Sequence, residues 1–95
     1  MNIMRVTIKF LKPFSDAVGK NVVAVDFKGN TLEELINILL KDYPQLKNEF
    51  YTKNGDLAEY INIFVNDKPM SALKGTHTEL KNSDEILFFI PISGG

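Results

Sequence analysis

The chain has 95 residues, of which 44% are hydrophobic, and its formal net charge is −1 at pH 7. This length fits one domain with a modest core, and a charge so near zero argues against a general nucleic-acid or membrane-surface binder. Cysteine is absent, which excludes disulfides, thiolate metal sites and a cysteine nucleophile.

The first third of the chain predicts two strands. Residues 4–10 alternate, with apolar side chains at every second position and Arg5, Thr7 and Lys9 between them, as in a half-buried strand. Residues 11–19 connect this strand to a second alternating strand near residues 21–27. The Lys-Gly-Asn sequence at residues 28–30 then breaks the pattern.

A helix follows, and it is the clearest element of the sequence. Thr31 and Glu34 have the spacing of a capping box, in which each side chain accepts a hydrogen bond from the other residue's backbone. Apolar residues then recur at helical spacing at Leu32, Leu35, Ile36, Leu39, Leu40 and Tyr43. Pro44 ends the pattern, so we expect a helix from Thr31 to Pro44. The stripe lasts fewer than two heptads, which favours core packing over a coiled coil.

The second half of the chain predicts more strands. Residues 45–59 are polar and predict a loop with a short helical piece, and residues 60–65 predict a third strand. Asn66-Asp67 turns this strand into a short extended piece near residues 68–70. A turn at residues 80–85 then leads into a last, strongly apolar strand at residues 86–90.

This order of elements indicates an α+β fold, in which a mixed sheet of four to five strands packs on one main helix. Such a sheet around one helix is the ubiquitin-like β-grasp, with the first and last strands parallel in its middle. We expect the β-grasp domain to span residues 1–91. Residues 92–95 form a short C-terminal tail that ends in Gly94 and Gly95.

The two terminal glycines are the most informative feature for function. A terminal glycine pair arises by chance in roughly 0.5% of chains at average glycine usage. Because glycine lacks Cβ, this tail could lie flat in a narrow channel and bring its carboxylate to another protein's active site. Chemistry at the backbone terminus also suits a chain that has no cysteine.

At this point the sequence resembles the ubiquitin-like sulfur-carrier family, most closely the small subunits of molybdopterin synthase (molybdopterin converting factor subunit 1). The similarity covers nearly the whole chain, and its most specific block is Phe88 to Gly95. The other blocks are residues 9–11, 16–19, 31–44, 61–66 and 80–86. Ser83 departs from the pattern, because relatives commonly carry glycine in that turn.

The resemblance implies a carrier that catalyses nothing itself and holds no permanent cofactor. A partner adenylating enzyme, similar to ubiquitin-activating enzymes, would use ATP to convert the Gly95 carboxylate into an acyl-adenylate. The persulfide of a sulfur donor would displace AMP and leave a thiocarboxylate on Gly95. The large subunit of molybdopterin synthase would then receive the sulfur.

Alternation also predicts where partners dock. Ile86, Phe88 and Ile90 should face the helix, which leaves Leu87 and Phe89 on the open face of the sheet together with Tyr60 and Phe64. The predicted contact set comprises Leu11, Phe64, Leu87, Phe89 and Pro91, with Ile92, Ser93 and Gly94 in the tail. In the alternative interpretation, residues 45–59 fold over this face and turn it into a minor core.

Three functions remain open at this stage: a sulfur carrier, a modifier joined to lysines of other proteins through Gly95, and an interaction domain with an idle tail. A carrier for cysteine or thiamine synthesis belongs to the first class.

His77, the only histidine, lies in a polar turn-like stretch and is expected on the surface without a metal. No stretch approaches the length of a membrane span, and residues 1–5 do not resemble a signal peptide, so we expect a cytoplasmic protein. Met1 and Met4 are both candidate starts.

Overall fold

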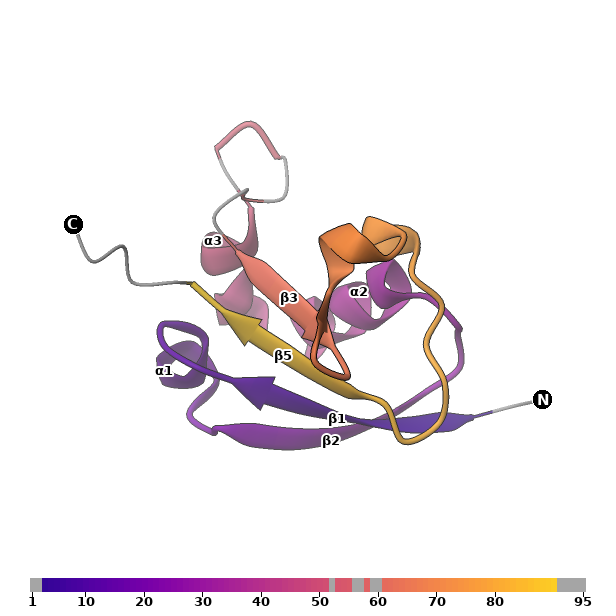
Figure 1. The fold of residues 1–95 in the computed structure, drawn as a ribbon. Helices are drawn as coiled ribbons and strands as arrows, with labels where there is room; N and C mark the ends of the chain where they lie inside the picture. The colour runs from indigo at the N-terminus through magenta and orange to yellow at the C-terminus, as the bar shows by residue number, and fades with distance from the viewer. Residues whose placement is uncertain (1–2, 52, 56–57, 59–60, 91–95) are drawn as a thin grey trace.

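The computed structural model describes residues 3–51, 53–55, 58 and 61–90. Five strands form one mixed sheet in the order β2-β1-β5-β3-β4 (Figure 1). The strands are β1 (Met4–Phe10), β2 (Val22–Phe27), β3 (Asn62–Val65), β4 (Lys68–Pro69) and β5 (Glu85–Phe89). The α-helices are α1 (Phe14–Val18), α2 (Leu32–Asp42) and α3 (Lys47–Phe50), and the short 3-10 helices are η1 (Pro44–Leu46), η2 (Met70–Ala72) and η3 (Gly75–His77).

The centre of the sheet is the parallel pair β1 and β5, as the sequence predicts. Each central strand has an antiparallel neighbour on its other side, β2 beside β1 and β3 beside β5. The bounds differ slightly from the prediction. The last strand begins at Glu85, which lies opposite Thr7, and it ends at Phe89. The third strand begins at Asn62, and residues 59–60 lie outside the described part of the chain.

The main helix, α2, begins as its capping box predicts. The Thr31 hydroxyl accepts a hydrogen bond from the Glu34 amide at 3.3 Å, and the Glu34 carboxylate accepts one from the Thr31 amide at 3.2 Å. These bonds satisfy amides that an α-helix leaves free in its first turn. The face of α2 that packs on the sheet is buried and consists of Leu32, Leu35, Ile36 and Leu39.

The connection at residues 11–19 contains a helix, α1, where the sequence pattern predicts only a link between two strands. Its five residues are too few to show a helical period. The chain leaves α1 through Gly19, whose φ of +83° is left-handed and whose amide donates to the Ser15 carbonyl at 2.8 Å. This backbone geometry favours glycine. The helix buries Phe14 completely.

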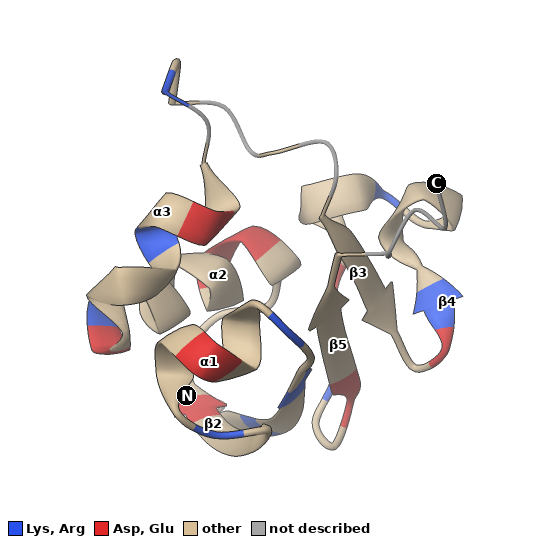
Figure 2. Cartoon of the chain, turned by 90° about the vertical axis from the view of Figure 1, so that its left-hand side faces the viewer, with Lys and Arg blue, Asp and Glu red and all other residues tan. Residues whose placement is uncertain are grey.

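Four phenylalanines join the helices to the sheet. The ring of Phe88 on β5 lies 5.7 Å from that of Phe10 on β1 and 5.3 Å from that of Phe50 on α3, measured between centroids. Phe14 on α1 lies 6.3 Å from Phe88 and 5.3 Å from Phe50. Figure 2 shows all three α-helices gathered on one side of β5 and β3. The sheet therefore has a helix-covered face and an open face.

The capping box gives a prediction about acid stability. Hydrogen bonds from the backbone amide of Asn30, and then from Thr31, lower the pKa of the Glu34 carboxyl from its ordinary value of 4.5. A lowered pKa stabilises the folded state above the ordinary value, and this stabilisation is lost as the pH falls through the folded-state pKa. We therefore expect Glu34→Gln to be less stable than the unmodified chain near pH 7, with the difference shrinking at about pH 3.

Urea unfolding at both pH values measures this difference. Glu33→Gln is the matched control, because it removes the same charge from the same helical turn without touching the capping box. A stability difference for Glu34→Gln that stayed constant between the two pH values would contradict the assignment.

Candidate docking face and C-terminal tail

The open face of the sheet carries apolar side chains beside the end of β5. Ile86 and Phe88 are fully buried, whereas Leu87 and Phe89 are only half-buried. On β3, Phe64 is likewise half-buried between fully packed neighbours. The alternation predicted from the sequence is therefore confirmed for these strands, because inward and outward positions differ in exposure as a pleated sheet requires.

These outward side chains form one continuous surface. Phe64 lies directly across from Leu87 in the β3–β5 register, and its ring lies 5.5 Å from that of Phe89. Leu11 follows β1, and its amide donates to the Phe88 carbonyl at 3.0 Å, which places Leu11 beside β5. The Leu11 residue is 52% exposed. We call Leu11, Phe64, Leu87 and Phe89 the docking face.

The predicted tail follows this surface directly in sequence. The last described residue, Ile90, comes immediately after β5. Tyr60 and the predicted tail and contact residues Pro91, Ile92, Ser93, Gly94 and Gly95 lie outside the described residues. The structure thus places the domain's side of the candidate site, while the role of Gly95 stays a prediction from the sequence.

The described part of residues 45–59 does not fold over the docking face. Leu46, Phe50 and Ala58 are buried within the main core, and Phe50 packs against the inward ring of Phe88. The Ala58 amide also donates to the Phe50 carbonyl at 2.7 Å. This segment therefore packs on the helix side of the sheet, opposite to what the minor-core interpretation requires.

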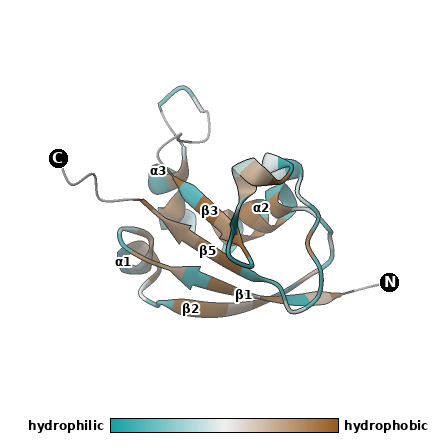
Figure 3. Cartoon of the chain, in the orientation of Figure 1, coloured by the Kyte–Doolittle hydropathy of each residue, from teal (hydrophilic) through white to brown (hydrophobic). Residues whose placement is uncertain are grey.

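The rest of the open face is charged. The Lys9 ammonium lies 2.7 Å from the Glu85 carboxylate, and the Arg5 guanidinium lies 2.7 Å from the Asp26 carboxylate. The hydrogen bond and charge of Glu85 raise the pKa of Lys9. Figure 3 shows hydrophilic bands on β1 beside a largely hydrophobic β5. The apolar part of the face is thus concentrated toward the end of β5.

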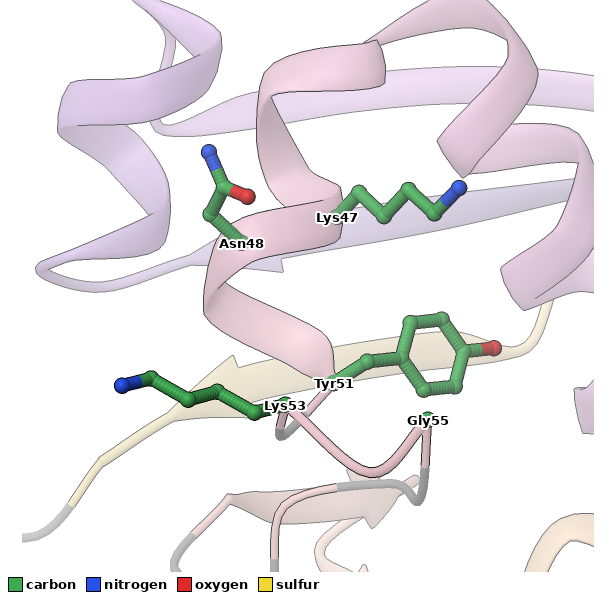
Figure 4. Close-up of a pocket in the computed structure, with 5 residues that line it drawn as sticks. All are labelled: Lys47, Asn48, Tyr51, Lys53 and Gly55. Atoms are coloured by element: carbon green, nitrogen blue, oxygen red, sulfur yellow. The ribbon is translucent and has the colours of Figure 1, made fainter.

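Other hollows of the described surface lack the features of a catalytic site. One of them, of about 540 Å³, lies beside α3 and is lined by Lys47, Asn48, Tyr51, Lys53 and Gly55. Figure 4 shows Lys47 and Tyr51 extending to one side and Lys53 to the other, so their polar groups do not converge. His77 is exposed on η3. Within the described residues, no three acidic, histidine or cysteine side chains cluster as metal ligands would.

The helices of the described part of the chain are all too short or too polar to cross a membrane. The longest of them, α2, has 11 residues, whereas a bilayer span needs about 20 apolar residues.

Comparison with known proteins places the fold and the family. The small archaeal modifier protein 1 of Methanosarcina acetivorans has a solution structure that matches with a TM-score of 0.84 and 29% identity, covering 100% of both chains. The complex of BexX and CysO from Amycolatopsis orientalis contains a chain that matches with a TM-score of 0.76 and 26% identity, over 95% of this chain and 99% of that one. The fold is therefore the ubiquitin-like β-grasp predicted from the sequence.

Two relatives match in sequence. Small archaeal modifier protein 1 of Haloferax volcanii is 26% identical over 92% of this chain and 97% of its own length. A protein of Archaeoglobus fulgidus named as a sulfur carrier is 26% identical over 83% of this chain and 90% of its own length. The model of the ThiS family matches residues 8–95. The chain therefore belongs to the ThiS family, in agreement with the resemblance to ubiquitin-like sulfur carriers seen in the sequence.

Truncating a side chain to alanine should lower the free energy of unfolding by different amounts on the two faces of the sheet. Phe88→Ala removes a ring at the centre of the core, and we expect it to lower the free energy of unfolding by about 3–5 kcal/mol. Phe64→Ala removes a half-buried ring from the docking face, and we expect a loss of about 1–2 kcal/mol. Urea unfolding of both variants makes the comparison. Equal losses would mean that the docking face is a second core.

Proposed function

We propose that this chain carries sulfur as a thiocarboxylate on Gly95 and delivers it to a precursor of molybdopterin. An adenylating enzyme similar to ubiquitin-activating enzymes loads the tail, and the large subunit of molybdopterin synthase receives the sulfur. The chain itself catalyses nothing in this scheme, and ATP is consumed at the active site of the partner. Because ATP is supplied in the cytoplasm, the proposal places the protein there.

The chemistry needs only the backbone terminus of this chain. A free carboxylate is a poor electrophile, so its oxygen first attacks the α-phosphorus of ATP, and pyrophosphate leaves. The terminal sulfur of a persulfide then attacks the carbonyl carbon and displaces AMP. A second thiol then attacks the donor's own sulfur in the resulting acyl disulfide, which forms a disulfide with the donor and releases the thiocarboxylate. Its ionised sulfur is a strong nucleophile, as thiolates are.

One observation carries the proposal: the match to the family model extends through residues 8–95 and therefore includes Gly94 and Gly95. The docking face supports it, because β5 ends this face and leads directly into residues 91–95. A partly exposed apolar surface of this kind is typical of protein contacts. A partner bound there would meet the tail where it leaves the domain.

A second candidate function is the modification of proteins at lysine. It is favoured by the names of two relatives, the small archaeal modifier proteins 1 of Haloferax volcanii and Methanosarcina acetivorans. Both functions begin with the same adenylate on Gly95, so they differ only in the acceptor. Mass spectrometry of the protein isolated from its host separates them. A thiocarboxylate on Gly95 supports sulfur transfer, and isopeptide bonds to lysines support modification.

The tail gives the first functional prediction. Deletion of Gly95 removes the carboxylate that reacts, and Gly94→Val adds a β-carbon inside the channel that the tail enters. We expect deletion to abolish ATP–pyrophosphate exchange by the host's adenylating enzyme. We expect Gly94→Val to reduce it by about 100-fold, since small misplacements of reacting groups cost that much.

The control for both variants is the circular-dichroism melting curve, which should match that of the unmodified chain because the changes lie beyond the last strand. Normal exchange with the chain that lacks Gly95 would refute the proposed activation.

The docking face gives the second functional prediction. Phe89→Asp places a charge at the end of β5, where the partner must exclude water. We expect the affinity for the adenylating enzyme to fall by roughly 30-fold, as for a central interface residue. Calorimetric titration measures the affinity, and Glu33→Ala on α2 is a control on the other face of the sheet. A large fall in melting temperature with unchanged affinity would assign Phe89 to the core.

A further inference from the structure

The open face continues past the docking face into a hollow of about 370 Å³ beside α1. Its apolar lining includes Leu11 and Leu87, which belong to the docking face, and Val22 at the start of β2. The β1–β2 register places Val22 opposite Lys9, and the β1–β5 register places Leu87 on the other side of Lys9. Three segments that are distant in sequence therefore meet at this hollow.

The hollow exposes apolar groups that a solitary domain has no reason to expose. Val22 is 55% exposed and Leu11 is 52% exposed. These are two of the four large apolar residues that are most exposed in the described part of the chain. Single exposed apolar residues need no explanation, but two that line the same hollow next to a docking face form a patch.

Lysines surround this apolar floor. Lys9 and Lys12 line the hollow, and an adjoining hollow of about 360 Å³ is lined by Lys12, Asp16 and Lys20. Figure 2 shows an acidic segment on α1 and basic segments near it. Counting Glu85, which pairs with Lys9, three ammonium groups face two carboxylates, so the rim has a charge of 3 − 2 = +1. The whole chain has the opposite sign, −1.

The lysines of the rim differ in how far they are engaged. The Lys9 ammonium is held by Glu85 at 2.7 Å. The Lys12 ammonium is 3.9 Å from Asp16, and both side chains are largely exposed, so this pair contributes little. Lys20 forms no ion pair with any described residue. Of the three lysines of the rim, Lys12 and Lys20 are therefore the two whose ammonium groups remain available to donate hydrogen bonds to a partner.

We propose that this hollow receives an acidic segment of the adenylating enzyme, in which an apolar side chain is flanked by carboxylates. The apolar side chain fills the space between Leu11, Val22 and Leu87, and the carboxylates approach Lys12 and Lys20. This inference rests on the proposed function, because it concerns the partner that activates Gly95. An apolar floor inside a basic rim fits such a segment better than it fits a nucleic acid. The exposed lysines would hold a small anion only weakly.

The test is the dependence of ATP–pyrophosphate exchange on the concentration of this chain. The hollow variant is Lys12→Glu/Lys20→Glu, and the matched control is Lys28→Glu/Lys41→Glu, which makes the same change in net charge outside the hollow. We expect the KM for the hollow variant to exceed that of the control by about tenfold at low salt. The difference should shrink as salt screens the charges.

The apolar floor requires a separate variant. Leu11→Ser/Val22→Ser should raise the KM by a factor that does not change with salt, because it removes apolar contact rather than charge. Equal KM values for the hollow and control variants at low salt would overturn the electrostatic part of the proposal. An unchanged KM for the serine variant would overturn the apolar part.

Two further outcomes separate this inference from competing ones. ATP–pyrophosphate exchange that does not require Gly95 refutes the proposed function itself. Exchange that requires Gly95 but has the same KM for the hollow variant as for its control refutes only this inference. Analytical ultracentrifugation of the isolated chain tests a contact between two copies. Self-association that is lost in the hollow variant, with an unchanged KM, would assign the hollow to that contact and overturn the proposal.

Discussion

The burial of Phe88 is the constraint on which the rest of the structure depends. This residue lies on β5, which runs between β1 and β3, and it has no exposed surface. Its ring contacts aromatic rings from β1, α1 and α3. Successive side chains of a strand point to opposite faces, so fixing Phe88 inward fixes Leu87 and Phe89 outward. A register slip of one residue would exchange the two sets.

The same strand therefore serves stability on one face and, under the proposed function, recognition on the other. The inward ring of Phe88 on β5 packs against rings from the short helices α1 and α3. Segment 45–51 takes part in this packing through Leu46 and Phe50. The outward side chains of β5 are not covered by α1, α2 or α3, because these three helices lie together on the other side of β5 and β3 (Figure 2). Partners can then bind and leave without disturbing the core.

The sequence predicted what depends on local patterns and missed what depends on short segments and on register. The alternation at residues 4–10 and the capping box at Thr31 were sufficient for the central strands and α2. Helix α1 was not predicted, because five residues are too few to show a helical period, although Gly19 is typical of the residue that follows a helix. Ser83 has a φ of +75°, a conformation that explains why glycine suits that turn. The hollow could not be predicted from the sequence, because only the register of the strands brings Val22 close to Leu87.

Under the proposed function, the chain presents one small group to successive enzymes, and the length of residues 91–95 limits how far Gly95 can reach. Gly95 is the fifth residue after Ile90, so a fully extended tail spans at most about 18 Å. Under the proposed function, each partner's active site must lie within that distance of its contact with β5. Docking then confines the Gly95 carboxylate near the reacting groups and raises its effective concentration. A basic rim adds rapid association without adding apolar area, which suits a carrier that has to leave again.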